Sequence, residues 1–207
     1  GHGFLLDRLY FETQLQELYQ QTNNSFYKGY KLKKVVSEET KTIATIENAT
    51  EIITLTADFI IDATGRKASV CRHLNIPKEN LDTQFALTFN VELSENIPNE
   101  IIVEATENGW WYVAPFAENE ITMMFFTLKT LLPSKENTEA FLQAALQNTK
   151  HLSKIIQNIT IGAVKIMPAG TSCLQIPYGK NWLAVGDASY SYDPISSYGI
   201  TSALASG

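Results

Sequence analysis

Residues 85–93 alternate strictly between apolar and less apolar side chains, and this alternation restricts the fold more than any other feature of the chain. Every odd position is apolar: Phe85, Leu87, Phe89, Val91 and Leu93. Because successive side chains of a strand point to opposite faces, the pattern predicts a strand that is buried on one face. Apolar runs follow at 101–105, 110–116 and 121–128. We therefore expect an antiparallel sheet in the middle of the chain.

Two short, strongly apolar strands far apart in the sequence predict a second layer. They lie at 58–63 and 182–185, and small or turn-forming residues follow each of them. The sequence thus predicts an α+β fold with a discontinuous layout. Residues 1–78 and 159–207 would form an incomplete α/β layer, and residues 79–158 an inserted antiparallel-sheet domain. One long helix, from Ser134 or Asn137 to about Ile156, belongs to the insertion.

Composition excludes several classes of protein. The formal net charge is -6 and there is no Lys/Arg run, so nucleic-acid binding has little support. No apolar run approaches the roughly 20 residues of a transmembrane helix. Only two cysteines are present, which argues against a disulfide framework and fits a reducing cytoplasm. The three histidines and two cysteines have no metal-ligand spacing, so no metal site is expected.

Three segments carry groups suited to a ligand. Arg8 lies in the first turn of a helix that Asp7 caps, where it either faces a bound anion or is simply solvated. Thr64-Gly65 ends the first apolar strand, either as a ligand-binding edge or as an ordinary turn. Gly186-Asp187 ends the second apolar strand. Lys165 and Arg66 are expected to be solvated cations.

The segment after Asp187 is too long and too rich in small residues for an ordinary turn. It passes through Pro194 and Ser197-Tyr198-Gly199 into a helix. Such a stretch leaves backbone N–H groups free at a helix N-terminus, which suits a carbonyl or an anion.

Together these motifs resemble the FAD-dependent oxidoreductases of the p-hydroxybenzoate hydroxylase fold, and most closely their tryptophan halogenase and geranylgeranyl reductase branch. The residues that carry the resemblance are Arg8-x-x-Phe-Glu-x-x-Leu, the run IIDATGRKASVCRHL from Ile60, and WLAVGDASYSYDPISSYGITSAL from Trp182. The resemblance covers both ends of the chain, roughly half of it.

The resemblance implies FAD as the cofactor and assigns roles to the matching residues. Arg8 would contact the ribityl–pyrophosphate region and Asp187, after Gly186, a ribityl hydroxyl. The amides of the helix N-terminus would face the isoalloxazine and stabilise negative charge on the reduced flavin. The cofactor-binding set is therefore Arg8, Thr64, Gly65, Gly186, Asp187, Pro194, Ser197, Tyr198 and Gly199.

The run GWWYVAPF resembles the halogenase Trp-x-Trp-x-Ile-Pro motif, with Tyr112 and Ala114 in place of its second Trp and its Ile. Trp110, Trp111 and Tyr112 are accordingly either a wall of the substrate pocket or sheet packing. Ser196 stands where tryptophan halogenases carry a Glu, and their catalytic Lys has no counterpart, so tryptophan halogenation is not expected. Halide binding by the amides of Tyr198 and Gly199 remains open.

The expected function is that of a flavin-dependent oxidoreductase, monooxygenase- or halogenase-like, with unknown catalytic residues. Its partners would be a small-molecule or peptide substrate and a reductant, either NAD(P)H or a flavin reductase. A geranylgeranyl-reductase-like enzyme is the alternative. The Gly-x-Gly-x-x-Gly unit of this fold is absent, so we expect a fragment that is inactive alone, or a cofactor-free substrate-binding or scaffold domain.

Overall fold

The protein is described by a computed structural model over residues 6–93, 100–117, 119–157 and 159–207. It forms two compact units, residues 1–60 and 61–207. The first unit contains helix α1 (Arg8–Gln20), which begins as predicted because Oδ1 of Asp7 accepts the N–H of Tyr10 at 2.9 Å. An antiparallel sheet follows, in the order β1 (Lys31–Ser37), β2 (Thr42–Glu47) and β3 (Ile52–Ala57).

The second unit is built around a five-stranded antiparallel sheet, which confirms the sheet that the alternating segments predict. Its order is β10-β6-β9-β8-β7. The strands are β6 (Gln84–Glu92), β7 (Ile102–Thr106), β8 (Gly109–Ala117), β9 (Glu120–Leu128) and β10 (Lys165–Pro168). The edge strand β10 comes from outside the range 79–158. The assignment of ranges to a cofactor domain and a substrate domain stays a prediction.

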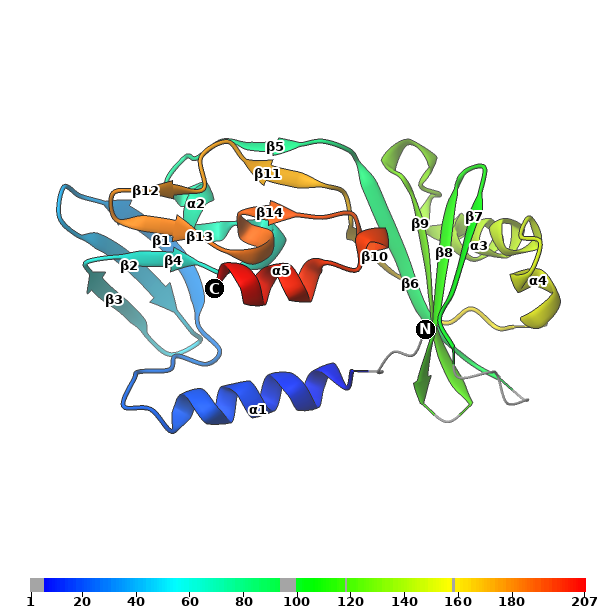
Figure 1. Cartoon of the computed structure of the whole chain (residues 1–207), viewed down its shortest axis with the longest axis horizontal. Helices are drawn as coiled ribbons and strands as arrows, with labels where there is room; N and C mark the ends of the chain where they lie inside the picture. Colours follow the sequence, from blue (N-terminus) through cyan, green and yellow to red (C-terminus); the bar gives the residue numbers. More distant parts are fainter. Residues whose placement is uncertain (1–5, 94–99, 118, 158) are drawn as a thin grey trace. The chain divides into compact units, whose positions relative to one another are not determined.

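The core of this unit lies between one face of the sheet and two helices, α3 (Thr138–Gln147) and α4 (Leu152–Ile155), which pack beside it in Figure 1. Leu87, Phe89 and Val91 point into this core, as the alternation predicts. Trp111 and Phe125 join them from β8 and β9, with their ring centroids 4.8 Å apart. Apolar burial on this face is the main stabilising term for the unit.

The helix that the sequence predicts to run to about Ile156 ends instead at Gln147, and α4 is a separate turn of helix. The hydroxyl of Thr149 donates to the carbonyl of Leu146 at 2.7 Å, which competes with helix continuation. The carboxylate of Glu104 on β7 accepts the backbone N–H groups of Lys150, His151 and Leu152. These N–H groups are therefore not available to extend α3.

Smaller elements complete the second unit. One three-stranded sheet has the order β14 (Tyr190–Ser191), β11 (Ser172–Leu174) and β5 (Lys78–Asn80), and another has the order β12 (Tyr178–Gly179), β13 (Trp182–Ala184) and β4 (Ile60–Asp62). Before β10, residues 159–164 form no strand, and Ile161 packs into the core. Among the residues described, no helix is long and apolar enough to cross a membrane. The remaining elements are η1 (Gly65–Lys67), α2 (Ser69–His73), η2 (Lys129–Leu131), η3 (Lys135–Asn137), η4 (Gly186–Ala188), η5 (Pro194–Ser196) and α5 (Gly199–Ser206).

Candidate functional site

The turn that follows β4 is organised by the fully buried carboxylate of Asp62. Its Oδ1 accepts from the N–H and the hydroxyl of Thr64, at 3.0 and 2.6 Å, and its Oδ2 accepts the N–H of Cys71 at 2.9 Å. Burial alone would raise the pKa of Asp62, but these hydrogen bonds outweigh it and hold the pKa below its usual value. Thr64 thus has its hydroxyl engaged within the turn, and Gly65 follows at φ +65°.

Cys71 is a buried structural thiol, because burial and the nearby carboxylate of Asp62 raise its pKa to about 12. Cys71 and Cys173 are both free. Within the described ranges, no group of three or more His, Cys, Asp or Glu side chains is arranged to hold a metal ion.

Arg66 joins the two strand-end motifs, although the sequence gives it no role beyond a solvated cation. Its Nη1 donates to the carbonyl of Gly170, and its Nη2 donates to the carbonyl of Tyr192 at 2.7 Å. Its Nε lies 3.6 Å from Oδ2 of Asp187. Gly170 and Tyr192 are far from Arg66 along the chain, so no local pattern in the sequence reveals this function.

Gly186 and Asp187 lie at the end of β13, beside the turn after β4. The N–H of Val185 donates to the carbonyl of Asp62 at 3.0 Å, which brings the two strand ends together. Gly186 has φ +54°, and a Cβ there would lie 3.3 Å from the Cβ of Ala203 on α5. The carboxylate of Asp187 is about one-third exposed and ion-paired only with Arg66 among the described residues. It therefore keeps acceptor capacity for a ligand hydroxyl.

The segment 193–199 turns the chain into α5. Oδ1 of Asp193 accepts the N–H of Ile195 at 3.0 Å, which caps the short helix η5 that starts at Pro194. Ser197 then adopts a left-handed conformation with φ +52°, and Tyr198 packs edge-on against Tyr192. Gly199 begins α5 with open space where a Cβ would be.

The first turn of α5 exposes unpaired backbone donors. The N–H groups of Gly199, Ile200 and Thr201 make no hydrogen bond to any described residue. A polar edge of this kind, lying on the same compact unit as the carboxylate of Asp187, suits a ligand that carries both hydroxyl donors and carbonyl acceptors. FAD has both, in its ribityl chain and its pyrimidine edge. These residues therefore fit the cofactor.

Arg8 lies in the other compact unit, exposed on α1. Its Nε pairs with Oε1 of Glu12, one helical turn later, at 2.6 Å, and its side chain is 74% exposed. An intrahelical pair of this type contributes little to stability. Its predicted contact with FAD stays a prediction.

The three aromatic residues proposed for the substrate pocket lie on opposite faces of the sheet. Trp110 and Tyr112 share the face away from α3, where Trp110 stacks on Phe126 with a centroid distance of 3.9 Å and an interplanar angle of 9°. Trp111 points to the other face and is fully buried in the core, with its Nε1 donating to the carbonyl of Ala145 at 3.4 Å. The structure thus brings Trp110 and Tyr112 together and separates Trp111 from them.

Gln84 and Thr88 lie on the same face of the sheet as Trp110, and no sequence motif had indicated them. They lie on β6, and Thr88 pairs across the sheet with Met124, which itself pairs with Tyr112. Oε1 of Gln84 and Oγ1 of Thr88 are buried and have no hydrogen-bond partner in the described part of the chain. Buried polar atoms without partners are uncommon in folded proteins, which sets these two side chains apart from the rest of the sheet.

Comparisons with known proteins identify the family of the chain. The family model described as tryptophan halogenase matches residues 1–206. LodB of Marinomonas mediterranea, provisionally described as an FAD-dependent oxidoreductase, is 24% identical over 157 residues, which are 74% of this chain and 42% of LodB.

Two flavin-dependent enzymes have a similar fold. The halogenase CmlS superposes with a TM-score of 0.83 at 18% identity, over 96% of this chain and 38% of CmlS. The brominase Bmp2 does so with a TM-score of 0.83 at 16% identity, over 98% of this chain and 54% of Bmp2. The chain thus spans about half or less of each relative. The resemblance inferred from the motifs is confirmed: the chain belongs to the tryptophan halogenase family.

Proposed function

We propose that this chain provides the isoalloxazine–ribityl part of an FAD site and the substrate sheet of a flavin-dependent oxidoreductase that oxygenates or halogenates an organic substrate. The observation that carries the proposal is the carboxylate of Asp187, held by Arg66, on the same compact unit as the unpaired amides that begin α5. Relatives named as halogenases support the choice of reaction class.

Each part of this site has a separate task. Asp187 accepts a hydrogen bond from a ribityl hydroxyl, and Arg66 fixes the direction of that carboxylate. The amides of Gly199 and Ile200, at the positive end of the α5 dipole, stabilise negative charge on the pyrimidine edge. When bound, FAD supplies the redox chemistry, with electrons from NAD(P)H or a flavin reductase.

The substrate would lie against the face of Trp110 and Tyr112. Trp110, stacked on the buried ring of Phe126, presents an apolar ring on this face, and the side-chain oxygens of Gln84 and Thr88 beneath the same face have no partner among the described residues. A small molecule or a peptide side chain with a planar apolar part and an N–H or O–H group matches this surface.

The test is FAD binding by the protein expressed from its complete gene. We expect visible flavin absorbance after purification or after addition of FAD. Asp187→Asn should weaken FAD affinity by about tenfold, the loss typical of a charge-assisted hydrogen bond.

Glu79→Gln is the control, because Glu79 is exposed on β5 in the same unit and lies outside the proposed site. Flavin titrations of the three proteins, followed by fluorescence, give the comparison. Absence of bound flavin together with no uptake of added FAD would refute the proposal.

A further inference from the structure

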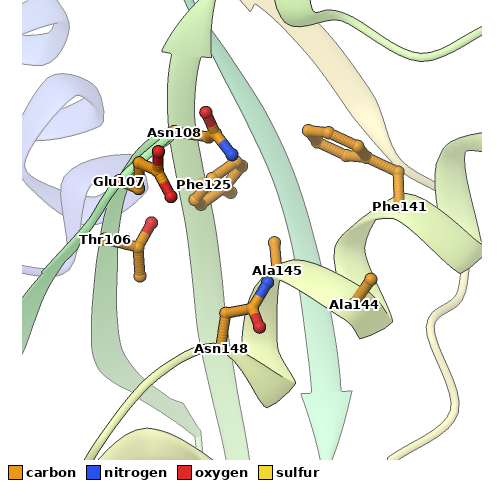
Figure 2. Close-up of a pocket in the computed structure, with 8 residues that line it drawn as sticks. All are labelled: Thr106, Glu107, Asn108, Phe125, Phe141, Ala144, Ala145 and Asn148. Carbon is orange, nitrogen blue, oxygen red and sulfur yellow. The ribbon is translucent and has the colours of Figure 1, made fainter.

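A cavity of about 470 Å³ lies behind the substrate sheet, on the face that α3 covers (Figure 2). It is surrounded by the turn between β7 and β8, by the ring of Phe125 on β9, and by the side of α3 that carries Phe141 and Ala145. Its lining residues are Thr106, Glu107, Asn108, Phe125, Phe141, Ala144, Ala145 and Asn148. It is separate from the face of Trp110 and Tyr112, so it takes no part in the FAD or substrate sites proposed above.

Fixed elements keep this cavity open. The indole of Trp111 anchors α3 through the carbonyl of Ala145, and the small side chains of Ala144 and Ala145 leave the space beside the helix unfilled. The opposite wall is fixed by two hydroxyls. Thr106 donates to the carbonyl of Gly109 at 3.0 Å, and Thr127 donates to the carbonyl of Asn108 at 2.7 Å.

The lining contains one charge and no compensating cation. The carboxylate of Glu107 makes no ion pair or hydrogen bond to the described residues, and no Lys, Arg or His lines the cavity. The side-chain amides of Asn108 and Asn148 are likewise without protein partners there, so either can present its oxygen to a ligand. Figure 2 shows the carboxylate of Glu107 and the amide of Asn108 on the side of the cavity where Phe125 lies.

Two further features favour positive charge. Asn148 is the C-cap of α3, so the negative end of the helix dipole lies at this wall. The partly exposed ring of Phe141 lies edge to face with the fully buried ring of Phe125, with centroids 5.8 Å apart, and an aromatic ring attracts cations over its face. The carboxylate, the amide oxygens, the helix C-terminus and the ring face of Phe141 therefore all select the same kind of ligand.

We propose that this cavity binds an organic ammonium ion. The ammonium group lies on the exposed carboxylate of Glu107, and the amides of Asn108 and Asn148 line the same cavity. The hydrocarbon part of the ligand packs against Phe141 and the small side chains of Ala144 and Ala145, and the cavity volume admits an arylalkylamine.

The test compares benzylammonium with benzyl alcohol, its uncharged isostere, by calorimetry and by mapping of ¹H–¹⁵N chemical shifts. Benzylammonium should bind saturably and at least about tenfold more tightly than benzyl alcohol. The shifted amides should cluster at residues 106–109 and 144–148. Equal affinity for the two probes, or shifts elsewhere, would overturn the proposal.

Variants identify the groups responsible. Glu107→Gln should weaken the affinity for benzylammonium by about tenfold and leave the affinity for benzyl alcohol unchanged. Glu139→Gln, an acid in the first turn of α3 outside the lining, should have no effect. Ala144→Leu fills the cavity from an exposed helix position and should abolish binding of both probes. If Glu107→Gln binds benzylammonium with wild-type affinity, the proposal is wrong. Shift mapping of the wild-type protein tests the proposal independently of any variant.

A lysine side chain of a peptide presents the same ammonium group, and Nα-acetyl-lysine amide distinguishes this source. Tighter binding of benzylammonium assigns the cavity to a free arylalkylamine. Tighter binding of the lysine derivative assigns it to a peptide. Failure of both to bind refutes the ammonium site while leaving the FAD proposal untouched, because the two sites share no residue.

Discussion

At the scale of single residues, one buried and one partly buried polar side chain decide how the candidate site is built. Asp62 holds Thr64 and the start of α2, while Arg66 holds two distant carbonyls and the carboxylate of Asp187. Both side chains are hydrogen-bond partners of backbone groups at the ends of short strands, and these groups would otherwise have no partner. The chemistry of the site thus depends on residues that do not themselves face the proposed ligand.

Asp62→Asn should destabilise the second unit by about 2 kcal/mol, because an NH₂ group would face at least one of the N–H donors that Asp62 now accepts. Urea unfolding at neutral pH measures the change. Glu79→Gln, on an exposed acid in the same unit, is the matched control and should change stability by less than about 0.5 kcal/mol. A loss for Asp62→Asn as small as that of the control would show that the buried carboxylate does not organise the turn.

At the scale of elements, the break between α3 and α4 depends on a carboxylate from a neighbouring strand. Glu104 accepts three consecutive N–H groups at the start of α4. Burial raises the pKa of Glu104, but the N–H groups of Leu152, Lys150 and His151 lower it more, so its pKa lies below the usual value. A single acid on β7 thus supplies the acceptors for these three N–H groups, while Oγ1 of Thr149 accepts the next one, from Ser153, at 2.8 Å.

This capping makes stability depend on pH in a defined direction. The pKa of Glu104 in the folded protein is lower than the ordinary glutamate pKa of 4.5, so Glu104 stabilises the fold fully above that pH. This contribution is lost as the pH falls through the pKa of the folded state. Glu104→Gln should therefore be less stable than wild type at pH 7, and the difference should shrink below about pH 4.5.

Unfolding free energies between pH 7 and pH 3 check this dependence. Glu139→Gln serves as the control, because Glu139 shows no comparable set of backbone donors. A difference between Glu104→Gln and wild type that is constant across this range contradicts the capping role.

At the scale of the whole molecule, the two units differ in how much core they contain. The second unit buries Leu87, Trp111, Phe125 and many neighbours. Among the described residues of the first unit, only Val35 and Thr42 are buried, and α1 contains no buried residue. Stability is therefore expected to be uneven along the chain.

Native-state hydrogen exchange should show this difference directly. Amides in β6 and β9 should exchange at least roughly a hundredfold more slowly than those in α1, which corresponds to about 3 kcal/mol. The amides of β1–β3 should lie between them. Equal protection of α1 and β9 would mean that the chain unfolds as a single cooperative unit.

Much of the fold follows from local patterns. The alternation at 85–93 predicts a one-sided strand, Asp7 predicts the start of α1, and the motifs around Gly65 and Asp187 indicate the family. The same two-residue period also separates Trp111 from Trp110 and Tyr112, although the three are adjacent in the sequence. Local periodicity is readable because it depends only on backbone geometry.

Other features depend on contacts between residues far apart in the sequence, and only the tertiary structure decides them. Arg66 finds its carbonyl partners at Gly170 and Tyr192, and Glu104 ends a helix that begins more than thirty residues later. The cavity behind the sheet exists only because a hairpin turn and α3 meet there. The sequence by itself determined four strands of the central sheet (β6 to β9), the start of α1 and the family. Folding decided which side chains share a site, because burial and hydrogen bonding act between segments that no local pattern connects.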